Sequence, residues 1–200
     1  MTKKTSQVEL WRSEFGDAYT ERNVFDYQVR LPAWRVMMEG LELSRILEVG
    51  CNYGGNLRAL ADINPAWDIT GIEPNDHARK MAPQGQSHIH LLPGTVFDMD
   101  FEGGAFDLSF TANVLIHIAL ADLPAAIQQI YRSSRRYMLA IEYFAEQETE
   151  INYRGHTNAL WKRNFKKHFE DLNPSLRLLR TGYWDKTVGF DASTWWLWEK

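Results

Sequence analysis

Residues 45–56, RILEVGCNYGGN, have the composition of a cofactor-binding turn: an apolar run, an acid and several glycines. Glycine lets a turn bend tightly and lets the backbone approach a ligand. A second apolar run, WDITGIEP at 67–74, contains another acid near its end, Glu73. A carboxylate there can accept hydrogen bonds from both hydroxyls of a ribose. The two segments predict a nucleotide-type cofactor site at the carboxyl edge of a parallel sheet.

The expected elements would place these two segments side by side. Strands are expected at 45–50, 68–74, 88–94, 106–113 and 136–144, and helices at 55–63, 75–82, 120–134 and 159–172. Alternation of this kind implies right-handed crossovers and a mostly parallel sheet. Two last strands, 175–184 and 193–200, have no helix between them and should pair antiparallel. The fold class is therefore α/β, with seven strands and an antiparallel C-terminal hairpin.

The N-terminal residues are expected to be helical and to lie outside the sheet. Val8, Trp11, Phe15 and Tyr19 recur at helical spacing. A second helical stretch covers residues 24–40, where Pro32 should break or kink it. We expect residues 1–42 to form a helical lid on a domain of residues 43–200, the whole chain being one structural domain.

Composition narrows the class of protein. The 200 residues suit one domain, and a hydrophobic fraction of 44% is ordinary for a globular protein. A net charge of −4 does not favour binding to nucleic acid or to an anionic membrane. The single cysteine, Cys51, excludes an internal disulfide, and His88 and His90 lack partners at metal-ligand spacing, so no metal site is expected. Without a signal peptide or a membrane-length apolar run, a cytoplasmic enzyme is expected; the oligomeric state is not predicted.

The glycine turn does not match a dinucleotide fingerprint. In G-x-G-x-x-G, the corresponding residues are Gly50, Asn52 and Gly55, so the middle glycine is missing where a pyrophosphate would approach. Glu48 would also repel a pyrophosphate. It could instead face a cationic ligand or hold the loop through backbone N–H groups.

These features resemble the class I S-adenosylmethionine-dependent methyltransferases. The resemblance is carried by the acid-x-Gly of residues 48–50, the acid Glu73, the segment FDLSFTANVLIHI at 106–118 and the closing hairpin. It implies a Rossmann-like sheet of order 3-2-1-4-5-7-6 and S-adenosylmethionine as cofactor. The chain departs from the usual D/E-x-G-x-G-x-G turn at Asn52, a residue type that tolerates left-handed backbone.

The ends of the chain resemble a narrower family, the small methyltransferases associated with pseudaminic acid biosynthesis. The matching segments are WRSEFGDAYTERN at 11–23, YRGHTNALWKRNF at 153–165 and TWWLWEK at 194–200. This implies a surface-glycan setting and a small-molecule acceptor, an anionic sugar or nucleotide sugar, methylated on oxygen or nitrogen.

The resemblance also implies roles for residues around the strand ends. Gly50, Asn52 and Tyr53 should touch the methionine part, and Glu73 with Pro74 and Asn75 the ribose. The alternative is that Glu73 only caps the next helix, a role that Asn75 or Asp76 could fill without it. The backbone of Val96 should meet adenine, and the side chain of Thr95 or of Asp98 could do so as well. The Thr111 carbonyl should meet the amino group; Ala112 belongs to the same strand end, and Val114 presses on the cofactor or packs in the core. Tyr19 or Arg22 could bind the cofactor carboxylate. The expected cofactor-binding residues are Tyr19, Gly50, Asn52, Tyr53, Glu73, Pro74, Asn75, Thr95, Val96, Thr111, Ala112 and Val114.

Three side chains are candidates for the acceptor. His117 could take a proton as the methyl group arrives, or could orient a loop. Residues 151–180 carry seven Lys/Arg against two Asp/Glu. Arg154 and His156 could bind a carboxylate or phosphate there, whereas Lys162 and Arg163 should lie on a solvated helix face.

Two other functions remain open from the sequence. One is a non-catalytic protein that binds S-adenosylmethionine, since no strong catalytic group is visible. The other is a dinucleotide-dependent sugar-modifying enzyme, which the short chain and the antiparallel ending disfavour.

Overall fold

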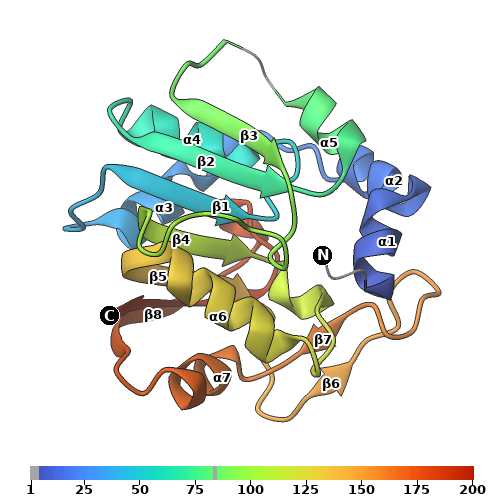
Figure 1. The fold of residues 1–200 in the computed structure, drawn as a ribbon. Coiled ribbons are helices and arrows are strands. Elements are labelled where there is room, and N and C mark those ends of the chain that lie inside the picture. The colour runs from blue at the N-terminus through green and yellow to red at the C-terminus, as the bar shows by residue number, and fades with distance from the viewer. Residues whose placement is uncertain (1–4, 83–84) are drawn as a thin grey trace.

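The computed structural model describes residues 5–82 and 85–200, and its centre is a seven-stranded sheet (Figure 1). The order of the strands is β3-β2-β1-β4-β5-β9-β8. Their bounds are β1 Arg45–Val49, β2 Asp68–Glu73, β3 Ile89–Pro93, β4 Phe106–Ala112, β5 Ser134–Glu142, β8 Arg177–Trp184 and β9 Ser193–Glu199. The first five strands run parallel, and β9 pairs antiparallel with both β5 and β8. The predicted order and the antiparallel hairpin are confirmed.

The register of the central strands brings three strand ends to one point. Val49 at the end of β1 pairs with Ile72 of β2 and with Thr111 of β4. Beyond the exposed Arg45, β1 is buried on both faces because helices cover each side of the sheet, and its buried side chains are apolar with one exception. The exception is Glu48, a buried acid one residue before the end of the strand.

Helices form a layer on each face of the sheet (Figure 1). One layer contains α3 (Leu31–Met38) and α4 (Gly55–Ile63), and the other α6 (Leu123–Ser133) and α7 (Phe165–Leu172). Trp34 and Met37 of α3 are fully buried against the sheet. Pro32 lies in the first turn of α3, after the 3-10 helix η1 (Tyr27–Arg30), so it begins a helix rather than kinking one.

The first two helices, α1 (Ser6–Arg12) and α2 (Glu14–Arg22), lie beside the carboxyl ends of the parallel strands, next to α5 (Asp76–Met81) (Figure 1). The one amphipathic helix expected here is two, because Ser13 ends α1 and its hydroxyl caps α2 by accepting the N–H of Phe15. A Cβ on Gly16 would lie 2.0 Å from the Trp11 carbonyl oxygen, so only glycine fits at this junction. Since α3 is part of the core, the segment that could act as a lid is α1 and α2.

A small two-stranded sheet follows β5 and was not predicted. Its strands are β6 (Thr149–Glu150) and β7 (Trp161–Lys162), so α7 begins later than the helix expected at 159–172. Lys162 and Arg163 therefore do not lie on a solvated helix face, and Arg163 is 1% exposed. No helix in the described ranges is long and apolar enough to cross a membrane.

Candidate cofactor and acceptor site

A cavity of about 400 Å³ lies at the carboxyl ends of β1, β2 and β4. Its walls come from the loops after these strands and after β3, from α1 and α2, and from the loop before β9. This is the edge where ligands bind in open α/β sheets.

The glycine turn after β1 is shaped for close approach by a ligand. Gly50 has φ +75°, and Asn52 has φ +50°, so both lie in the left-handed region. The N–H of Gly50 donates to the Ile72 carbonyl at 2.8 Å, which fixes the turn against β2. A Cβ on Gly50 would lie 2.6 Å from Cγ2 of Val114, so this side of the turn has room only for glycine.

Glu73 joins the turn after β1 to the turn after β2. Its two carboxylate oxygens accept the N–H groups of Asn52 and of Asn75, each at 2.9 Å. Each oxygen keeps a second lone pair for a ligand. Burial raises the pKa of Glu73, and the two N–H donors oppose this shift. The capping of α5 is done by Asn75, whose side-chain oxygen accepts the N–H of Ala78 at 2.7 Å, so Glu73 is free of that role.

Glu48 lies in the cavity wall with one oxygen unpartnered. Its Oε1 accepts from Asn56 Nδ2 at 2.7 Å, whereas Oε2 has no hydrogen-bond partner and is buried. Burial raises the pKa of Glu48 to about 8, against the Asn56 hydrogen bond and the positive charge of Arg30. An unpaired buried oxygen beside a cavity is a position where a cationic ligand group would be stabilised.

Arg30 is the charged side chain next to Glu48. Its Nη1 donates to Asn56 Oδ1 and its Nε to the Gly189 carbonyl, both at 2.8 Å. The guanidinium lies between the rings of Phe25 and Phe190, 3.7 and 4.4 Å from their centroids. These contacts fix a half-buried cation in the cavity wall, where it can pair with a ligand carboxylate.

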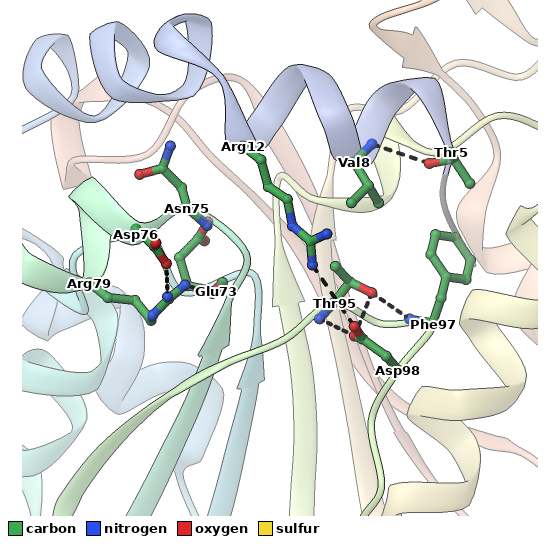
Figure 2. A network of polar contacts seen from close by, with 10 residues as sticks. All are labelled: Thr5, Val8, Arg12, Glu73, Asn75, Asp76, Arg79, Thr95, Phe97 and Asp98. Atoms are coloured by element: carbon green, nitrogen blue, oxygen red, sulfur yellow. Dashed lines mark hydrogen bonds and ion pairs between the residues drawn. The ribbon is translucent and has the colours of Figure 1, made fainter. Parts of the chain in front are cut away.

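The loop after β3 is closed by its own hydrogen bonds (Figure 2). The hydroxyl of Thr95 donates to Asp98 Oδ1 at 2.6 Å and accepts the N–H of Phe97 at 3.1 Å. Figure 2 also shows Arg12 reaching from α1 towards Asp98, with 4.0 Å between Nη2 and Oδ2. The side chain of Thr95 is thus occupied within the loop, while Thr95, Val96 and Phe97 line the cavity.

His117 lies in the cavity wall as a neutral, oriented imidazole. It belongs to the 3-10 helix η2 (Leu115–His117) after β4. Its Nδ1 is 2.6 Å from the carbonyl oxygen of Ala159, so Nδ1 carries the proton and Nε2 is the acceptor. Burial lowers the pKa of His117 to about 4. The ring packs edge-on against Trp11 of α1, with 4.6 Å between centroids.

Several tyrosines gather near Asp191, at the end of the cavity formed by the loop before β9. The hydroxyl of Tyr143 donates to Asp191 Oδ2 at 3.1 Å. Burial raises the pKa of Tyr19, and the neighbouring Tyr153 and Asp191 raise it further. Tyr19 and Asp191 both line the cavity, so this end offers a phenol and a carboxylate to a ligand.

The cavity contains most of the residues predicted from the sequence. Those that line it are Tyr19, Gly50, Asn52, Tyr53, Glu73, Pro74, Asn75, Thr95, Val96, Ala112, Val114 and His117. Thr111 is fully buried in β4 and is not part of the lining. Arg154 and His156 are exposed in a tight turn outside the lining, where the ring of His156 packs against Phe15.

Other lining residues were not identified from the sequence, among them Trp11, Phe25, Arg30, Asn56, Phe190 and Asp191. Arg30 follows no strand and belongs to no motif; its only signal is a basic residue among apolar ones before Pro32. In the described part of the chain, no group of three or more His, Cys, Asp or Glu side chains could hold a metal ion.

Comparison with known proteins agrees with this geometry. Residues 46–136 match the family described as "Methyltransferase domain". No match to the chain was found among curated proteins. The matched segment runs from the second residue of β1 into β5, so it includes the glycine turn, Glu73, the loop after β3 and His117.

Solved structures with the same fold are methyltransferases of low sequence identity. The 1,6-didemethyltoxoflavin-N1-methyltransferase of Burkholderia thailandensis, solved with S-adenosylhomocysteine, has a TM-score of 0.74 at 13% identity, over 100% of this chain and 92% of that one. The magnesium protoporphyrin IX methyltransferase of Synechocystis PCC 6803, also solved with S-adenosylhomocysteine, has a TM-score of 0.70 at 15% identity, over 96% and 97%. A methyltransferase from Mesorhizobium loti has a TM-score of 0.65 at 12% identity, over 86% and 98%.

The fold and the family match together define the class of protein. Residues 46–136 match a methyltransferase domain, and the chain shares the fold of methyltransferases that were solved with S-adenosylhomocysteine. The sequence-based predictions of the Rossmann-like fold, of an enzyme and of this cofactor are confirmed.

Proposed function

We propose that this chain transfers the methyl group of S-adenosylmethionine to an oxygen or nitrogen of a small-molecule acceptor held under α1 and α2. The observation that carries the proposal is the pairing of Glu73 with the glycine turn, across the ends of adjacent strands. Glu73 offers lone pairs to a ribose diol while its other hydrogen bonds hold Asn52 and Asn75 in place.

The structure offers complementary groups for the two charges of the methionine part. The unpartnered Oε2 of Glu48 suits the amino group, and Arg30, fixed by Asn56 and Gly189, suits the carboxylate. Ammonium binding would also stabilise the ionised form of Glu48, whose pKa burial raises to about 8. At Gly50 an added Cβ would clash with Val114, so only glycine keeps this turn packed beside the cavity. The residues present therefore fit the cofactor, with Val96 on the adenine side.

Methyl transfer needs alignment more than acid–base chemistry. When bound, S-adenosylmethionine supplies a methyl group that is already activated by its sulfonium, and the acceptor displaces it in line. The residues of the chain hold the reactants in line and exclude water. His117, neutral with Nδ1 bonded to Ala159, presents Nε2 as an acceptor to the O–H or N–H of the nucleophile. With a pKa of about 4 it orients this group, and it is too weak a base to keep the proton at neutral pH.

We assign the acceptor to the part of the cavity lined by Trp11, Tyr19, His117 and Asp191, which we name the acceptor end. The comparisons do not support the pseudaminic acid-associated family, and the two named relatives act on different substrates. An anionic sugar of a surface-glycan pathway, in a cytoplasmic enzyme, remains our narrower proposal from the ends of the sequence. Since Arg154 and His156 lie outside the lining, an anionic group could reach them only by extending beyond the cavity.

Calorimetry with S-adenosylhomocysteine tests the proposal. Glu73→Ala should lose roughly 2–4 kcal/mol of binding free energy, because it removes hydrogen bonds to a charged acceptor. Asp68→Asn is the matched control, since it changes an acid at the opposite, half-exposed end of the same strand. Unchanged affinity in a folded Glu73→Ala variant would refute the ribose assignment. Tighter binding of a nicotinamide dinucleotide than of S-adenosylhomocysteine would refute the function.

A further inference from the structure

The helix η2, which carries His117, is held at its N-terminal end by a buried carboxylate. Glu142, the last residue of β5, is fully buried. It accepts the N–H groups of Val114, Leu115 and Ile116 at 3.2–3.3 Å. A single carboxylate thus satisfies three donors that a short helix leaves unpaired.

The other end of η2 is held by a buried cation. Nη1 of Arg163 donates to the Ile118 carbonyl at 2.7 Å and to the Leu115 carbonyl at 3.4 Å. Arg163 is itself fixed, because its Nε pairs with Glu148 and its guanidinium lies 4.8 Å from the centroid of Trp161. A 1% exposed arginine that binds carbonyl oxygens sets where they lie.

The same segment of chain also holds the imidazole. Ala159, four residues before Arg163, accepts from Nδ1 of His117. The segment 159–163 therefore fixes both the helix and the ring that the helix carries. It lies outside the family match, which ends at residue 136.

We propose that Arg163, acting with Glu142, is a positioning residue that fixes η2 so that Nε2 of His117 faces the acceptor end. Arg163 is not part of the cavity lining, so its effect on the site would be exerted through His117. The inference rests on the proposed function for the meaning of this orientation, whereas the orientation itself can be measured without an acceptor.

The test is the imidazole of His117 in protein labelled with ¹⁵N-histidine, observed by long-range ¹H–¹⁵N correlation as the pH is varied. The signal is assigned by its loss in His117→Gln. In wild type, the ring should be neutral with its proton on Nδ1 until the pH approaches about 4. Arg163→Met, which keeps the length and apolar stem, should free η2. The ring should then exchange between tautomers, and its pKa should rise by at least about one unit towards the ordinary value of roughly 6.5.

Arg180→Met is the matched control. Arg180 also binds carbonyl oxygens, those of Val36, Met37 and Glu39, but at the end of α3. It should leave the His117 signal unchanged. An unchanged signal in Arg163→Met, or an equal change in Arg180→Met, would overturn the proposal.

If Arg163→Met does not fold, Arg163→Lys decides, because lysine keeps the charge but has no second nitrogen to pair with Glu148 while the first binds the carbonyls. It should give a smaller change of the same kind, and a wild-type signal would overturn the proposal. Titration of wild type with S-adenosylhomocysteine tests the proposed function separately from the positioning role of Arg163. Absence of binding would refute the proposed function without altering the result on the ring.

Discussion

The hydroxyl of Thr20 on α2 lies 2.8 Å from the side-chain oxygen of Asn52 and donates to it. The N–H of Asn52 in turn donates to Glu73. The helix over the cavity, the glycine turn and the acid at the end of β2 therefore form one chain of hydrogen bonds. A ligand bound at Glu73 should therefore change the stability of α2.

Residues 11–23 should behave as a lid. We expect their amide hydrogens to exchange more slowly when S-adenosylhomocysteine binds, because the ligand would bridge the sheet and these helices. Hydrogen exchange read by mass spectrometry measures this, with α7 as the internal reference. Equal exchange with and without ligand would leave α1 and α2 as fixed structure.

The hydrogen bond from Thr20 should carry part of this effect. Thr20→Val preserves the shape of the side chain and removes the donor, so protection of α2 by the ligand should decrease. Thr181→Val removes a comparable hydrogen bond, from Oγ1 to the Trp195 carbonyl at 2.8 Å, far from the cavity. It should leave protection of α2 as in wild type.

Gly50→Ala should destabilise the fold more than Gly40→Ala. Both residues have positive φ, so alanine costs about 1–2 kcal/mol at either site. At Gly40 nothing lies within 4 Å of the added Cβ, whereas at Gly50 it would meet Val114 at 2.6 Å and add about 1–3 kcal/mol of overpacking. Urea denaturation of the two variants gives the difference. Equal free energies of unfolding would mean that Val114 moves aside without cost.

His117 should weaken the fold in acid. Its pKa is about 4 when folded and roughly 6.5 when unfolded, so the unfolded state binds more protons between these values. The free energy of unfolding contributed by His117 is present above about 6.5 and falls as the pH drops towards 4, by roughly 2–3 kcal/mol. His117→Gln should flatten this decline in denaturation curves at several pH values, whereas His156→Gln, at an exposed site, should keep it. A decline as steep in His117→Gln as in wild type would contradict the buried, neutral ring.

Glu48 should have the opposite sign, weakening the fold as the pH rises from about 5 to 8. Its pKa is about 8 when folded, above its unfolded value near 4.5, so the stability contributed by its protonated form is lost between these two values. Glu48→Gln cannot ionise. The free energy of unfolding of Glu48→Gln, relative to that of wild type, should therefore increase as the pH rises from 5 towards 8, by about 1.4 kcal/mol for each pH unit at most. Glu142, whose pKa burial raises to about 7, acts in the same direction in both proteins and cancels in the difference. Parallel curves would place Glu48 in contact with water or with a permanent cation.

The fold could be predicted because its signals are local and repeated. Apolar runs ending at Val49, Glu73 and Ala112, with helical segments between them, suffice for a parallel sheet. The strand at Trp161–Lys162 was missed because it depends on pairing with Thr149–Glu150. The break at Ser13 was missed although its signal is local, a serine that caps α2 through the N–H of Phe15. The charge pattern around Arg163 suggested a solvated helix, whereas its carbonyl partners at Leu115 and Ile118 lie more than 40 positions away.

The same distinction separates the site residues that were found from those that were missed. Gly50 and Glu73 stand at strand ends, where chain order alone predicts their position. Arg30 and Glu142 are recognised only by burial and by partners far along the chain. A single sequence does not encode which buried charge faces which cavity, because that depends on how separate elements pack.

Asn75 binds α1 and α2 from below: its side-chain nitrogen donates to the Trp11 carbonyl at 3.0 Å and to Asp17 Oδ1 at 2.8 Å. Two hydrogen bonds of this kind are worth about 1–3 kcal/mol together. If cofactor exchange requires those helices to lift, each catalytic cycle breaks and remakes these bonds. The rate at which α1 and α2 open would then set the upper limit of the turnover rate, however fast the methyl transfer itself is. Removing the hydrogen bonds of Asn75 would speed release of the demethylated cofactor, but it would also let more water into the cavity during methyl transfer.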